Sequence, residues 1–182
     1  MTAPDRRSFM AAAAASIATP VGLGAKECPT SAALCGYTLA PEASLTQITN
    51  ELKSAFDWLD ATAGEHGIQG PIIVTGWSAG GHLTSFILDH PTVALGLAIS
   101  GVFDLAALRD SPHVNDKVRL SEEEIQKLSP MRRPIVNKPL GIAYGTSELP
   151  AMIASSRDYH AYRSHPGRLD TYRQHQSLHD SG

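Results

Sequence analysis

Short apolar runs alternate with stretches of helical periodicity along most of the chain. Four runs predict strands, at 31–37, 71–75, 93–100 and 139–145. Continuous apolar strands separated by helices are typical of a parallel sheet that is covered on both faces. The pattern therefore predicts an α/β fold with a mostly parallel sheet and helices on both faces.

The helical stretches carry start signals of their own. Ser44 precedes a helix, and Gln47, three residues later, completes a capping box. One face of this helix is apolar and should pack on the sheet; it comprises Leu45, Ile48, Leu52, Ala55, Phe56 and Leu59. Ser121 begins a shorter capped helix, and two further helices are predicted, one ending at about Leu88 and one over about 149–162.

The most informative motif joins the second predicted strand to the helix behind it. Residues 76–80 read Gly-Trp-Ser-Ala-Gly and directly follow 71–75. A Gly-x-Ser-x-Gly sequence between a strand and a helix exposes its serine hydroxyl at the tip of a sharp turn. Ser78 is therefore a candidate nucleophile. The alternative is an ordinary serine-containing turn or helix cap.

A nucleophilic serine needs a histidine base and a carboxylate that orients this histidine. On such a turn the order along the chain is serine, acid, histidine. Asp104 follows the strand at 93–100, and Glu148 follows the strand at 139–145, where the acid of this architecture usually lies. Either carboxylate could instead cap a helix or remain solvated in a loop.

Length and charge limit the class of protein and its partners. The 182 residues suffice for one domain with a sizeable core, so residues 1–182 are interpreted as a single domain. A formal net charge of -3, without a basic stripe, argues against nucleic acid as a partner. No apolar segment reaches the roughly 18 residues of a membrane-spanning helix, so no membrane partner is expected.

Several motifs together resemble the α/β-hydrolase superfamily, and within it the kynurenine formamidase (arylformamidase) and carboxylesterase branch. They match in order and spacing and lie at 37–42, 76–83, 100–105, 128–130, 144–150 and 155–159. By this resemblance Ser78 corresponds to the nucleophile and Glu148 to the triad acid, while Asp104 has a structural role. The Ala79 N–H would supply half of an oxyanion hole, whose donors each lower the barrier by about 3–4 kcal/mol.

The resemblance also implies the reaction and its requirements. The substrate would be a small-molecule ester or amide, and no metal or organic cofactor would be needed. The chain departs from the family at both ends, because the His-Gly-Gly-x-Trp oxyanion loop and the Asn-His-Phe histidine motif have no counterpart. Residues 1–182 would then be a partial α/β-hydrolase domain that is truncated at the N-terminus and altered at the C-terminus.

The N-terminal residues permit two interpretations. Residues 1–25 carry a twin-arginine pair, an alanine-rich stretch and small residues, and so resemble an export signal. Residues 5–9 also match the Asp-basic-x-x-Phe pattern with which a helix opens in the family, and we prefer this alanine-rich helix, capped by Asp5. The protein would then be cytoplasmic, and the missing first strands would expose a sheet edge that permits self-association.

The histidine base is not identified by the sequence. Residues 165–182 are polar, rich in histidine and expected to be irregular, although this fold should add a last strand there. The candidate bases are His160, His165, His175 and His179. Because removal of a triad member leaves only residual catalysis, the alternative to a serine hydrolase is a catalytically defective remnant that lacks the oxyanion loop and the triad histidine.

A one-base change in the coding DNA near Leu169 would explain this tail. With permitted synonymous codons, residues 170–182 can be encoded by a string that, read one base later, gives Ile-Pro-Ile-Ala-Ser-Thr-Asn-His-Phe-Thr-Ile-Leu. We therefore expect the encoding DNA to hold an apolar strand followed by the histidine motif in that second frame. Sequencing the DNA tests this, and codons that cannot yield Asn-His-Phe there would refute it.

Overall fold

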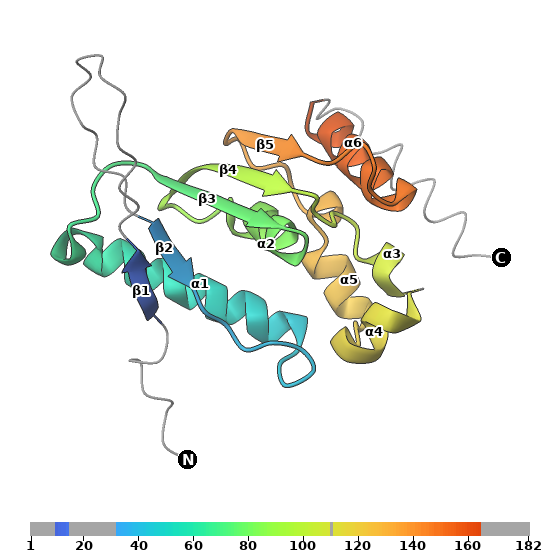
Figure 1. Cartoon of the computed structure of the whole chain (residues 1–182), viewed down its shortest axis with the longest axis horizontal. Coiled ribbons are helices and arrows are strands. Elements are labelled where there is room, and N and C mark those ends of the chain that lie inside the picture. Colours follow the sequence, from blue (N-terminus) through green and yellow to red (C-terminus); the bar gives the residue numbers. More distant parts are fainter. Residues whose placement is uncertain (1–9, 15–31, 110, 165–182) are drawn as a thin grey trace.

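The computed structural model describes residues 10–14, 32–109 and 111–164, and Figure 1 shows their helices and strands. The strands are β1 (Met10–Ala14), β2 (Ala32–Cys35), β3 (Ile72–Trp77), β4 (Val93–Ile99) and β5 (Leu140–Ala143). The α-helices are α1 (Leu45–Thr62), α2 (Ala79–Ile87), α3 (Ala106–Arg109), α4 (Pro112–Val118), α5 (Glu122–Leu128) and α6 (Pro150–Ser164). Two short 3-10 helices cover Ala63–His66 and Pro130–Arg132.

Three parallel strands form the central sheet, in the order β3, β4, β5. Val74 lies opposite Gly96, which in turn lies opposite Leu140, so the carboxyl ends of the three strands meet at one edge (Figure 1). The parallel sheet flanked by helices that the apolar pattern predicts is confirmed. Strand β2 is also present, but it pairs antiparallel with β1 in a separate two-stranded sheet.

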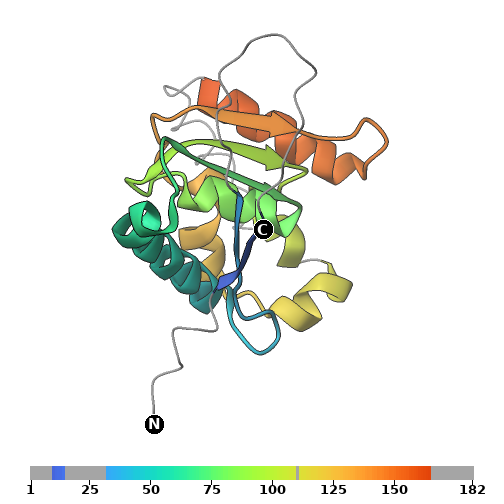
Figure 2. The ribbon, with the colours of Figure 1, turned by 60° about the vertical axis from the view of Figure 1, so that its left-hand side comes forward.

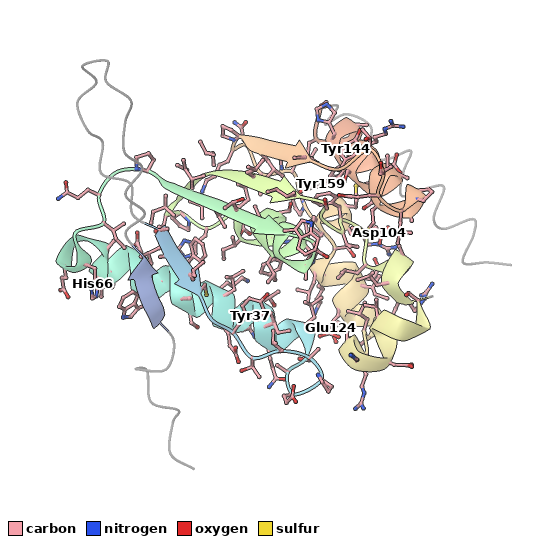
Figure 3. All side chains as sticks on the ribbon, in the orientation of Figure 1. Tyr37, His66, Asp104, Glu124, Tyr144 and Tyr159 are labelled. Atoms are coloured by element: carbon pink, nitrogen blue, oxygen red, sulfur yellow. The ribbon has the colours of Figure 1, made fainter. Side chains whose placement is uncertain are left out.

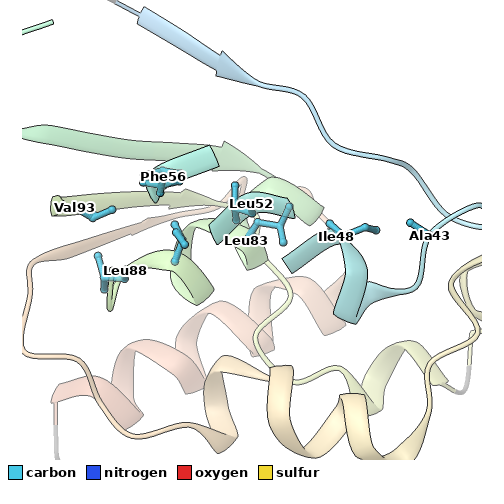
Figure 4. Packing of buried hydrophobic residues seen from close by; sticks show 8 residues of the cluster. Ala43, Ile48, Leu52, Phe56, Leu83, Leu88 and Val93 are labelled. Carbon is cyan, nitrogen blue, oxygen red and sulfur yellow. The ribbon is translucent and has the colours of Figure 1, made fainter. Parts of the chain in front are cut away.

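Helix α1 packs on α2 and on one face of the central sheet. Its capping box is formed by Ser44 and Gln47 as the sequence predicts, and its buried residues include Leu45, Ile48, Leu52 and Phe56. The last three belong to a cluster with Ala43, Leu83, Ile87, Leu88 and Val93, most of which are labelled in Figure 4. Burial of each large aliphatic or aromatic side chain contributes about 1.5–3 kcal/mol, so this cluster fixes α1 and α2 relative to the sheet.

The two faces of the sheet differ in how far their side chains are covered. Figure 2 shows α1 and α2 on the same side of the sheet, and Tyr159 of α6 packs with Ala98 in a second cluster on that face. Side chains alternate along a strand, so the residues between the covered ones point to the other face. There Ile73, Trp77 and Leu97 are 57%, 72% and 39% exposed.

A buried carboxylate joins the N-termini of α1 and α5. Glu124 accepts hydrogen bonds from the backbone N–H and hydroxyl of Thr46 on one oxygen, both at 2.9 Å. Its other oxygen accepts two from Ser121, both at 3.1 Å, and the one from the Ser121 backbone N–H belongs to the capping box of the predicted helix α5. Burial raises the pKa of Glu124, but the four hydrogen bonds together outweigh burial, so the pKa lies below the ordinary value. The labelled Glu124 in Figure 3 lies between the two helices.

The preferred helix at the N-terminus is wrong for Met10–Ala14, which form strand β1. Met10 lies opposite Cys35 and Ala14 opposite Ala32 in the antiparallel pair. Alanine favours a helix only by a fraction of a kcal/mol per residue, so the backbone hydrogen bonds offered by β2 override that preference. Residues 1–9 and 15–31 lie outside the described residues, as does the predicted irregular tail at 165–182. Within the described ranges, no helix is both long and apolar enough to cross a membrane.

Candidate active site

Ser78 occupies a tight turn between β3 and α2. Its backbone has φ 55° and ψ -115°, a combination that costs a non-glycine residue about 1–3 kcal/mol and that is concentrated at functional sites. The turn requires glycine at Gly76, because a Cβ there would collide with the backbone of Gly80. A Cβ on Gly81 would likewise come within 2.8 Å of the Gly101 Cα. The strand, turn and helix predicted around Ser78 are therefore present.

Backbone hydrogen bonds join the ends of the three parallel strands. The N–H of Ser78 donates to the carbonyl of Ile99, at 2.9 Å, so the turn is bound to the last residue of β4. The N–H of Ser100 donates to the carbonyl of Ala143, the last residue of β5, at 2.7 Å. The residues that follow β3, β4 and β5 are thus held at one edge of the sheet.

Glu148 reaches the same edge from the loop after β5. Its Oε1 accepts hydrogen bonds from the hydroxyl of Ser100 and from the N–H of Gly145, the latter at 3.0 Å. The Ser100 hydrogen bond, and then that of Gly145, hold the pKa of Glu148 below its ordinary value. Its Oε2 is buried and has no hydrogen-bond partner among the described residues. An ionised carboxylate with a free acceptor atom can orient a histidine N–H.

The structure brings Ser78 and Glu148 to one edge through Ser100, whose hydroxyl the sequence analysis did not single out. The signal available was its position directly after β4, between the strands that carry the candidate nucleophile and acid. That position alone does not predict a contact with Glu148, which lies 48 residues further along the chain.

Asp104, the other candidate acid, is engaged in holding the loop after β4. Its two carboxylate oxygens accept hydrogen bonds from Nε and Nη2 of Arg132, at 3.2 and 3.3 Å. Oδ1 also accepts from the N–H of Ala106, the first residue of α3, at 3.0 Å. Figure 3 labels Asp104 and shows it on the loop that leads to α3. These contacts match the structural role that the resemblance implies.

Ala79 is the first residue of α2, and its N–H lies at the helix N-terminus. The first N–H groups of a helix have no acceptor within the helix, so they remain available to an anion. The next turn closes normally, because the N–H groups of Gly81 and His82 donate to the carbonyl of Ser78, at 2.9 and 3.2 Å. The N–H of Ala79, which directly follows Ser78, thus lies at the start of this helix.

Neither His82 nor the candidate base His160 completes the site. His82 is only 3% exposed, and its Nε2 hydrogen-bonds the carbonyl of Leu128, at 2.9 Å. His160 is exposed and lies ten residues into α6, about 15 Å along the helix from its start. His165, His175 and His179 lie outside the described residues. In the described part of the chain, no group of three or more His, Cys, Asp and Glu side chains could hold a metal ion.

Comparison with known proteins indicates which family shares this architecture. A family profile described as alpha/beta hydrolase fold matches residues 8–132, well over half of the chain. Curated protein sequences give no match. Among solved structures, a protein provisionally described as a thioesterase from a Silicibacter species is 27% identical with a TM-score of 0.59, and the match covers 71% of this chain and 50% of that one.

Two esterases extend the structural comparison. An esterase/lipase from an uncultured bacterium is 22% identical with a TM-score of 0.61, over 76% of this chain and 53% of its own. An esterase from Pyrobaculum calidifontis is 18% identical with a TM-score of 0.62, over 75% of this chain and 53% of its own. The chain therefore spans about half the length of these solved structures.

The buried imidazole of His82 should make folding stability depend on pH. Burial lowers the pKa of His82 to about 4, a shift that nearby Arg133 assists and the hydrogen bond to Leu128 opposes. The unfolded chain takes up the proton near pH 6.5, whereas the folded chain resists until about pH 4, so stability is lost as the pH falls between these values. We expect the free energy of unfolding to fall by about 2 kcal/mol between pH 7 and pH 5.

Urea unfolding followed by tryptophan fluorescence measures this dependence. His82→Gln should be less stable at pH 7 but should lose much less stability between pH 7 and pH 5. His66→Gln, in the exposed 3-10 helix after α1, is the matched control and should leave the dependence unchanged. A wild-type profile that is flat over this range, or an unchanged slope in His82→Gln, would contradict the expectation.

Proposed function

This chain belongs to the α/β-hydrolase fold family, and we propose that it is a serine hydrolase of the formamidase or carboxylesterase type. The observation that carries the proposal is the placement of Ser78. Ser78 lies in a positive-φ turn at the carboxyl edge of the sheet, and its N–H is bound to the last residue of β4. Ser100, the next residue after β4, hydrogen-bonds Glu148. This edge is where ligands bind in open α/β sheets.

Ser78, Ala79 and Glu148 each have a specific part in the proposed reaction. The Oγ of Ser78 attacks the carbonyl carbon of an amide or ester, while a histidine takes the hydroxyl proton and later delivers it to the leaving group. The N–H of Ala79 donates to the oxyanion of the tetrahedral intermediate. Glu148 accepts the other ring N–H of the histidine on its free Oε2.

An exposed apolar side chain follows the candidate acid and is compatible with a small organic substrate. Leu149 directly follows Glu148 in the sequence and is 74% exposed, whereas Trp77, which precedes Ser78, points to the uncovered face of the sheet. Binding sites for small molecules combine apolar surface with a few convergent polar groups. The descriptions of similar structures as a thioesterase and an esterase support the same reaction class. We propose a small-molecule ester or amide as the substrate.

The second candidate is a catalytically defective remnant of such a hydrolase. It is favoured by one observation, which is that Glu148 Oε2 has no histidine partner among the described residues. Without a base, the serine hydroxyl remains a weak nucleophile. The oxyanion site and substrate surface would then retain binding without turnover.

Reaction with a fluorophosphonate probe separates the two candidates. An active enzyme should be labelled at Ser78, as identified by peptide mass, and Ser78→Ala should abolish the labelling. Ser54→Ala, on the exposed surface of α1, is the matched control and should be labelled like the parent chain. Loss of the nucleophile in Ser78→Ala should also lower kcat/KM for a short-chain aryl ester by ~10³-fold or more. Comparing the parent chain's kcat/KM for this ester with that for an aryl formamide assigns the preferred acyl group.

The same experiment has a clear negative result. If the folded parent chain is not labelled, or if labelling persists in Ser78→Ala, then Ser78 is not the nucleophile. In the first case the remnant is the better account.

We further propose that the chain associates with itself through an exposed sheet edge. In the described part of the chain β3 and β5 are the outer strands, and Ile73 of β3 is 57% exposed. Unpaired edge strands can pair with those of another molecule. Size-exclusion chromatography with light scattering should therefore show dimers or larger species. Ile73→Lys should shift them toward monomer, whereas Ser54→Lys on α1 should not, and a stable parent monomer would contradict the proposal.

A further inference from the structure

We propose that Ser100 is a positioning residue that holds Glu148 with one carboxylate oxygen occupied and the other presented to the catalytic base. This inference rests on the proposed function, because it assigns a part within that site. Three features of Ser100 support this role: its backbone conformation, the partner of its hydroxyl group and its connection to Ser78. Packing alone does not explain all three.

The first feature is the backbone conformation of Ser100. Its φ is 50°, and only Ser78 and Arg119 share a positive φ among the described non-glycine residues. Glycine adopts this conformation without a steric penalty, whereas serine does not. Serine at this position therefore carries a backbone strain that glycine would avoid. The residue is also 4% exposed, so its hydroxyl needs a partner inside the protein.

The second feature is the partner that this hydroxyl has. It donates to Oε1 of Glu148, and the N–H of Gly145 donates to the same oxygen at 3.0 Å. A Cβ on Gly145 would lie 3.2 Å from that oxygen, so the backbone approaches the carboxylate closely. Two donors on Oε1 fix the rotation of the carboxylate. Its buried Oε2 is then left as the acceptor that a histidine N–H requires.

The third feature is the connection of Ser100 to the candidate nucleophile. The carbonyl of Ile99, the residue before Ser100, accepts the Ser78 N–H at 2.9 Å. On its other side, the N–H of Ser100 donates to Ala143 at 2.7 Å. One dipeptide therefore binds the nucleophile turn through its backbone and the acid through its side chain. The geometry points to Ser100 as the residue that sets the position of Glu148 relative to Ser78.

The test uses the full chain and two substitutions, Ser100→Ala and Ser100→Gly. Both remove the hydroxyl, and the glycine variant also removes the positive-φ strain, so it should fold at least as well as the parent. Carbon-13 NMR titration of glutamate carboxyl groups, with the Glu148 signal assigned by its loss in Glu148→Gln, reports the acid directly. We expect both variants to raise the pKa of Glu148 toward its ordinary value.

Ser147→Ala is the matched control, because Ser147 is exposed and adjoins Glu148 in the sequence. It should leave the Glu148 titration unchanged. If Ser100→Ala and Ser100→Gly also leave it unchanged in the folded protein, the hydroxyl does not hold the acid and the proposal is overturned. This measurement requires no catalytic activity.

The rate of Ser78 labelling by a fluorophosphonate provides the functional readout. We expect both Ser100 variants to slow labelling about 10- to 100-fold, the range known for loss of an outer hydrogen-bond partner at metal sites. Ester hydrolysis should lose kcat with little change in KM. A raised Glu148 pKa without slower labelling would overturn the positioning role. If the parent chain is unreactive, the proposed function fails, and the titration alone decides whether Ser100 holds Glu148.

Discussion

The arrangement of the site depends on close backbone contact at the carboxyl edge of three parallel strands. The Ser78 N–H binds the end of β4, and the Ser100 N–H binds the end of β5. These contacts require glycine at Gly76 and Gly81, where a side chain would meet neighbouring backbone. Because parallel strands end at the same edge, residues from distant parts of the sequence become neighbours there without any long connecting loop.

The sequence predicts those parts of the fold that depend on local chemistry. The capping box of α1 follows from Ser44 and Gln47, and the turn at Ser78 follows from the Gly-x-Ser-x-Gly motif, in which Gly76 has no room for a Cβ. The parallel sheet follows from apolar runs that alternate with helices. In each case the determining groups lie within a few residues of one another, so their spacing along the chain carries the information.

The features that the sequence did not predict depend on contacts between distant residues. The Ser100 hydroxyl contacts Glu148 only because β4 and β5 pair in this register. The direction of the hydroxyl also depends on a positive φ, which serine seldom adopts. Strand β1 was missed because alanine favours a helix only weakly, and the strand depends on pairing with β2. The role of Glu124 was missed because Thr46 lies 78 residues away. The histidine base stays a prediction, since three of its four candidates fall outside the described residues.

The buried carboxylate of Glu124 has a consequence for the cooperativity of the fold. Fraying of either helix from its N-terminus would break hydrogen bonds that Glu124 makes between the two, so opening of one helix should destabilise the other. The carbonyl of Leu128, at the end of α5, in turn hydrogen-bonds His82 within α2, the helix that directly follows Ser78. Local unfolding at the surface helix α1 is thereby coupled, through two buried polar contacts, to the rigidity of the turn that carries the candidate nucleophile.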